Sequence, residues 1–241
     1  MTLVVSLCLI DPVMKCPRCV QRMHNAATSC PHCGFTMADV DALFGNEDIV
    51  IKKLDDSAGV LRMREREALR ELMARFESRF PQLFLSIYVA AFEEMPSLRQ
   101  FGFWLLNRAD YSDGDVTRPN ENGILLVVDV NGKAAAMTYG YSLMPYLDED
   151  STFDALSAAH PYFLQREYLK AFKIVISRVE GTLRKGWRRA KKDPESLFAA
   201  SGQQVRSVDA ILRRIREESE ESEENQNSTE GPEVEEEKSK R

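Results

Sequence analysis

Four cysteines near the start of the chain constrain its fold more than any other feature. They form two Cys-x-x-Cys pairs, Cys16 with Cys19 and Cys30 with Cys33, separated by ten residues. Four thiolates at this spacing can surround one Zn²⁺ as a tetrahedron, and a proline inside each pair favours the tight turns that this requires. The pattern therefore predicts a short zinc ribbon. A shell closed by four sulfurs has no open coordination position, so we expect a structural role for the metal.

Other uses of these cysteines fit the pattern less well. A redox motif needs one Cys-x-x-Cys pair at a helix start rather than two matched pairs. A secreted disulfide scaffold spreads its cysteines through the fold. Clustered pairs favour reduced thiols and hence a cytoplasmic protein. His24 and His32 lie nearby, but four thiolates already complete the shell, so we expect both imidazoles to face solvent.

The first residues, 1–13, are apolar but show neither the basic region nor the cleavage site of a signal peptide. Met14 directly precedes the first cysteine pair, and zinc ribbons often open a protein. We interpret residues 1–13 as an overcalled start, with a short membrane anchor as the alternative. The apolar runs of the chain are shorter than the roughly 20 residues of a membrane span, so none is expected.

Charge separates the last residues from the rest. The chain carries a net charge of −6, whereas residues 217–241, with 11 Glu and three basic residues, carry −8, which leaves +2 for the remainder. This tail has no core-forming residues and is expected to be disordered. The chain is 44% hydrophobic and 29% charged, which suits one globular domain with appendages.

The middle of the chain alternates helix and strand signals. Apolar spacing of three and four residues predicts helices, apolar runs predict strands, and Asn131-Gly132 predicts a hairpin turn. The expected order is helix 57–79, strand 83–91, helix 96–107, strand 123–130, strand 133–139, helix 150–159 and helix 165–189. This order indicates an α/β domain with a small mixed sheet and helices packed on it.

Short motifs in this region resemble a known family. They are DSAGVL at 56–61, NGILLV at 122–127, GYSL at 140–143 with Leu147-Asp148, and PYF at 161–163 with Glu167-Tyr168. In this order and spacing they are similar to the TPM domain family, known from thylakoid-lumen proteins of photosystem II repair and from bacterial proteins. The resemblance covers roughly residues 52–185. This chain departs from the pattern of the family at Ser142, where a glycine is usual.

The resemblance implies an α/β/α sandwich with a central sheet of about four strands. Some members of the family are acid phosphatases, and some bind divalent cations. Asp56, Asn122 and Asp148 lie where strands or helices meet loops, and such ends form the ligand crevice of open α/β sheets. Their oxygen atoms suit Ca²⁺, Mg²⁺ or Mn²⁺, and an ion there could polarise a phosphate ester.

Each of these three residues also has a purely structural interpretation. Asp56 could cap a helix N-terminus, Asn122 could hydrogen bond within its own loop, and Asp148 could complement the dipole of the following helix.

Six basic residues and Trp187 crowd residues 184–192. Such a patch could bind nucleic acid, anionic lipid or an acidic protein. The alternative is a solvated helix end, whose dipole favours cations.

Two functions follow from these features. The first is an interaction or assembly module with a protein partner. The alternative is a metal-dependent phosphatase-like hydrolase of phosphate monoesters. Ser142 in place of glycine and the absence of a covalent nucleophile motif favour the first. The expected organisation is a possible overcalled start at 1–13, a zinc ribbon at 14–37, a linker at 38–51, the α/β domain at 52–190, a charged helix at 191–216 and the acidic tail at 217–241.

Overall fold

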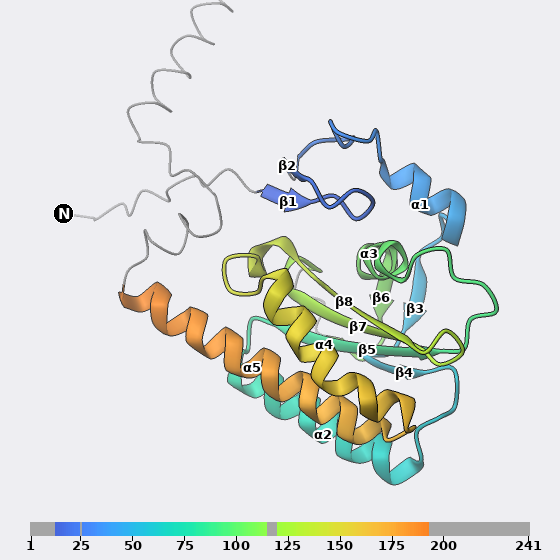
Figure 1. Ribbon diagram of the computed structural model, residues 1–241, viewed down its shortest axis with the longest axis vertical. Coiled ribbons are helices and arrows are strands. Elements are labelled where there is room, and N and C mark those ends of the chain that lie inside the picture. The colour runs from blue at the N-terminus through green and yellow to red at the C-terminus, as the bar shows by residue number, and fades with distance from the viewer. Residues whose placement is uncertain (1–12, 25, 115–119, 193–241) are drawn as a thin grey trace, which may run out of the picture. The chain divides into compact units, whose positions relative to one another are not determined.

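The computed structural model describes residues 13–24, 26–114 and 120–192. Its central element is a four-stranded sheet in the order β4-β5-β7-β8 (Figure 1). The first three strands are parallel, and β8 is antiparallel to β7. The strands are β4 (Leu54–Asp56), β5 (Phe84–Ala90), β7 (Gly123–Asp129) and β8 (Ala134–Tyr139).

The middle strands of the sheet are its most apolar segments. Every residue of β7 is buried, as expected for a strand covered on both faces. The predicted hairpin between β7 and β8 is confirmed. Asp129 stabilises its turn, because one carboxylate oxygen accepts the Asn131 N–H at 3.1 Å and the Phe92 N–H at 3.3 Å.

Helices cover both faces of the sheet, which confirms the predicted α/β/α sandwich. Leu85 and Ile87 of β5 and Leu126 of β7 point into a core with one helix layer. That layer holds α2 (Met63–Arg79), α4 (Glu149–Leu164) and α5 (Tyr168–Lys192). The alternate residues Phe84 and Leu125 face a second core with α3 (Leu98–Arg108).

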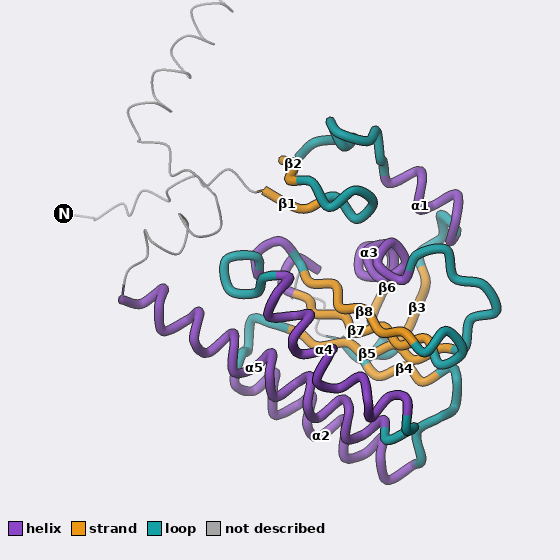
Figure 2. Tube along the Cα trace, viewed as in Figure 1, coloured by secondary structure: helices purple, strands orange, loops and turns teal. Residues whose placement is uncertain are grey.

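Short elements outside the expected order of the α/β domain complete the fold (Figure 2). Two of them, β3 and β6, form a parallel pair outside the main sheet. Single-turn 3₁₀ helices flank the hairpin. The elements are β1 (Val13–Lys15), β2 (Arg22–His24), α1 (Met37–Phe44), β3 (Ile49–Ile51), β6 (Ala109–Tyr111), η1 (Asn120–Asn122) and η2 (Tyr141–Leu143).

Two helix boundaries differ from the expected ones by five residues or more. The helix predicted from residue 57 begins at Met63, because 54–56 form β4 and the Glu65 carboxylate accepts the Arg62 N–H just before the first turn. The helix predicted over 150–159 continues to Leu164, through Pro161.

Some expectations lie outside the described residues. These are the interpretation of residues 1–12, the greater part of the charged helix at 191–216 and the disordered tail at 217–241. Among the helices that the structure describes, none is both long enough and apolar enough to cross a membrane.

Candidate metal centre

Two tight turns bring the four cysteines together. In the first, the Val20 N–H donates to the Cys16 carbonyl at 2.9 Å, and Val20 adopts a positive φ of 65°. In the second, the Gly34 N–H donates to the Cys30 carbonyl at 2.9 Å, with φ of 71° at Gly34. A glycine reaches this conformation without strain, so its place directly after the second pair has a physical reason.

The four sulfurs form one compact group. All four Sγ atoms lie within 4.8 Å of one another. The Cys16–Cys33 and Cys19–Cys30 sulfur pairs are each 3.7 Å apart, and all four thiols are free. Tetrahedral Zn²⁺ with Zn–S bonds near 2.3 Å separates its sulfurs by about 3.8 Å. The predicted cysteine cluster is confirmed, and its donor set and spacing fit a structural zinc ion.

The thiols differ in how readily they ionise. Burial opposes ionisation of Cys30, but the backbone N–H groups of His32 and Cys33 and two neighbouring thiols lower its pKa to about 6. At Cys33 the Phe35 N–H lowers the pKa, yet burial and the other three thiols outweigh it and raise the pKa to about 12. The Cys30 thiolate forms readily, whereas ionisation of Cys33 beside it is opposed. A divalent cation would remove that opposition.

The two nearby histidines stand apart from the cluster. His24 and His32 are both exposed, and Nδ1 of His24 accepts the Ala26 N–H at 3.1 Å. These positions agree with the expectation that the thiolates alone form the shell.

The cysteine ribbon packs against α3. Cys16, Cys30 and Phe35 are buried in the same apolar cluster as Trp104. The Phe35 and Phe103 rings meet edge to face with centroids 6.1 Å apart.

Polar contacts reinforce this attachment through α1 and the residues after it. The Arg108 guanidinium donates to both carboxylate oxygens of Asp41, at 3.1 and 2.6 Å. Trp104 Nε1 donates to the Gly45 carbonyl at 2.8 Å. These pairs could not be predicted from the sequence, because their partners are more than 50 residues apart.

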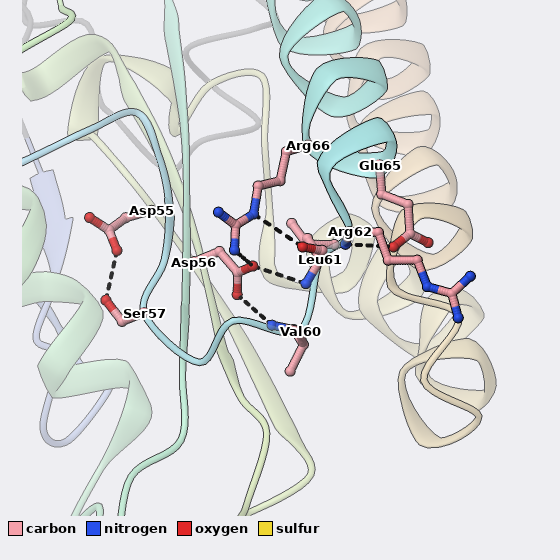
Figure 3. A network of polar contacts seen from close by, with 8 residues as sticks. All are labelled: Asp55, Asp56, Ser57, Val60, Leu61, Arg62, Glu65 and Arg66. Carbon is pink, nitrogen blue, oxygen red and sulfur yellow. Dashed lines mark hydrogen bonds and ion pairs between the residues drawn. The ribbon is translucent and has the colours of Figure 1, made fainter.

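Asp56, the first of the predicted oxygen ligands, is a structural anchor (Figure 3). Its carboxylate accepts the Val60 N–H at 3.1 Å and the Leu61 N–H at 2.9 Å, and it pairs with Arg66 at 2.9 Å. Its side chain is 2% exposed. Asp56 therefore fixes the loop between β4 and α2 and is not the N-cap of α2.

Asn122 lies directly before β7, at the open end of the hairpin. The Ser142 hydroxyl contacts both the Asn122 carboxamide and the Glu121 carbonyl. Gly140 permits this approach, because a Cβ there would stand 1.9 Å from the Glu121 carbonyl oxygen. Asn122 thus contacts a segment that follows the hairpin.

Asp148 caps α4. Its carboxylate accepts the Ser151 N–H at 2.8 Å, and its own N–H donates to the Ser151 hydroxyl at 3.3 Å. Hydrogen bonds from the Ser151 side chain and backbone hold the pKa of Asp148 below its usual value. The helix-start interpretation of this residue fits the structure.

The three predicted oxygen ligands do not share one crevice, which corrects the expectation from sequence. Asp56 ends β4 and is level with Val128 of β7 through β5, whereas Asn122 precedes the first residue of β7. These positions are six residues apart along parallel strands, or roughly 20 Å. Ligands of one divalent cation lie within about 5 Å of each other. Within the described residues, the cysteines are the one group of three or more His, Cys, Asp or Glu side chains close enough to hold a single ion.

Two pockets are lined in part by paired charges. One of about 420 Å³ is bordered by Lys53 and Arg108, which pair with Glu77 and Asp41. Another of about 290 Å³ lies beside Asp56 and its partner Arg66.

The chain also matches a known protein family. The model of the TPM domain family matches residues 54–182, more than half of the chain. The chain belongs to the TPM domain family. The predicted resemblance is confirmed, and the TPM domain here begins with β4 and ends within α5.

The chain is also similar, at low identity, to several solved structures. The BA42 protein from Bizionia argentinensis is 14% identical, with a TM-score of 0.43 over 52% of this chain and 83% of that one. The N-terminal domain of a P. gingivalis protein is 16% identical, with a TM-score of 0.43 over 62% and 91%. The N-terminal domain of cg2496 from Corynebacterium glutamicum is 9% identical, with a TM-score of 0.42 over 57% and 83%. A comparison with curated proteins found no match.

Proposed function

We propose that this protein is an interaction or assembly module in which a structural Zn²⁺ holds a ribbon on the TPM domain. The observation that carries the proposal is the closed group of four sulfurs, packed in the same apolar cluster as α3. A four-thiolate shell leaves no position for substrate. The ion would instead stabilise a segment too short to form a core alone.

The partner in this proposal is another protein, and the setting is the cytoplasm, where free thiols stay reduced. A ribbon fixed to a folded domain presents a surface of defined shape. Arg18 and Arg22 of the ribbon are exposed and available for contact.

The alternative is metal-dependent hydrolysis of phosphate monoesters, with Ca²⁺, Mg²⁺ or Mn²⁺ near Asp56, Asn122 or Asp148. Family membership supports it. The site geometry favours the module instead, because Asp56 and Asp148 are committed to backbone N–H groups and Asn122 lies at the other end of the strands.

One experiment separates the two functions. The full chain is assayed for hydrolysis of p-nitrophenyl phosphate with each cation and with chelator, beside Asp56→Asn and Asp148→Asn. The module predicts no turnover above these variants. Cation-dependent turnover that Asp56→Asn abolishes, in a variant that keeps its far-ultraviolet circular dichroism, would establish the hydrolase.

A further inference from the structure

The last two turns of α5 form a basic surface that the zinc module does not use. Arg184, Lys185, Arg188, Arg189, Lys191 and Lys192 are all exposed. At 3.6 residues per turn they cover an arc of roughly 160° of the helix. Trp187 lies at the edge of this arc, one turn from Lys191, and is 42% exposed.

The charge of this arc is largely uncompensated. Glu180, one turn earlier, pairs with Arg184 and with Arg79 of α2. In the described part of the chain, the other five cations of the arc have no ion-pair partner. The dipole at a helix C-terminus favours cations but acts only over the last turn, whereas the arc begins two turns before Lys192.

The opposite side of the same helix is committed to the core. Leu183 and Gly186 are buried, and a Cβ at Gly186 would stand 3.1 Å from the Tyr146 ring. Helices that lie on membranes insert a whole apolar face into the lipid. At this end of α5, Trp187 is the one apolar side chain of the described residues left to insert into lipid, so this end is poorly suited to binding a bilayer.

We propose that this arc binds single-stranded nucleic acid. Its cations match the regular negative charge of a phosphate backbone, and Trp187 offers a flat surface on which an unpaired base can stack. The inference goes beyond the proposed module and is independent of its zinc site, since the arc contains no ribbon residue.

The test is a fluorescence anisotropy titration of the full chain with labelled oligo(dT) of about 20 nucleotides, longer than the 4–16 nucleotides that small binding domains occupy. Arg188→Gln/Arg189→Gln removes two arc cations. Arg64→Gln/Arg75→Gln removes two exposed cations of α2 and gives the same change in net charge. We expect the arc variant to bind at least ~10-fold more weakly, with a salt dependence smaller by about 1.4 in log–log slope, and the α2 variant to bind normally.

Base stacking is tested separately. Trp187→Leu should weaken oligo(dT) binding about 5-fold or more and leave binding to the oligo(dA)·oligo(dT) duplex unchanged. Phe153→Leu, at another exposed aromatic residue, should change neither. Four results would overturn the proposal: no binding near 50 mM salt, where electrostatic binding is strong; equal losses in the two arginine pairs; no loss of oligo(dT) binding in Trp187→Leu; or tighter binding to phosphatidylserine vesicles than to oligo(dT).

Discussion

The cysteine ribbon and the ends of the central sheet both carry residues that metals favour, yet the chain uses them differently. The four sulfurs meet within 4.8 Å, and their thiols contact one another and a neighbouring backbone N–H group. Asp56 instead accepts backbone N–H groups of the loop that follows it, and Asp148 accepts one in the first turn of α4. Ligands that are close together in the sequence can therefore form a metal site by local turns alone. Oxygen ligands that are far apart in the sequence form a metal site only if the fold brings them together.

Loss of one cysteine should have the largest effect. Cys30→Ser removes a ligand from the middle of the ribbon, and structural zinc contributes an apparent 10–16 kcal/mol to small domains, about the whole stability of such a unit. We expect residues 13–37 to lose protection from hydrogen exchange while the sheet keeps it. His32→Ala, next to the pairs but exposed, is the control and should leave the ribbon protected. Equal protection in both variants would mean that the ribbon folds without metal.

Removal of the Asp56 carboxylate should have the second-largest effect on stability. Asp56→Ala leaves the Val60 and Leu61 N–H groups and the partly exposed Arg66 guanidinium without the buried carboxylate that they share. We expect the free energy of unfolding to fall by about 2–4 kcal/mol in urea denaturation. Asp55→Ala is the matched control, since within the described residues Asp55 accepts only the Ser57 hydroxyl. Unchanged stability in Asp56→Ala, together with lost binding of a divalent cation, would return Asp56 to the list of ligands.

The Asp148 cap should contribute less to stability than Asp56 does, and its contribution should depend on pH. Asp148→Ala should cost about 1 kcal/mol at neutral pH. The folded pKa of Asp148 is below its ordinary value, so this stabilisation is present above the ordinary pKa and is lost as the pH falls through the folded one.

Urea denaturation of wild type and Asp148→Ala across acidic pH measures this dependence. The charge-dependent part of the difference in unfolding free energy should shrink as the pH falls. A difference that grows on acidification would contradict the assignment.

Substitution of Ser142 should have the smallest effect on stability. This residue occupies a position where the family usually has glycine. Ser142→Ala removes the hydroxyl that contacts the Glu121 carbonyl and the Asn122 carboxamide. Because this contact is exposed, we expect at most ~1 kcal/mol in thermal unfolding. A much larger loss would show that the hairpin exit depends on this hydroxyl.

The sequence predicted what is encoded locally. The cysteine spacing, the apolar run of β7 and the Asn131-Gly132 turn each specify a structure within a few residues, and all three predictions are confirmed. β3 and β6 were missed, because each has three residues and is stabilised by pairing with a strand some 60 positions away. The same limit applies to the oxygen ligands: both Asp56 and Asn122 lie at strand ends, but only the register shows that these are opposite ends.

The most direct test of this contrast is the metal content of the full chain by native mass spectrometry, for wild type, Cys30→Ser and Asp56→Asn. The account predicts one zinc ion per chain in wild type, none in Cys30→Ser and one in Asp56→Asn. A wild-type chain purified with zinc present that holds no zinc, or zinc that disappears in a folded Asp56→Asn chain, would contradict it.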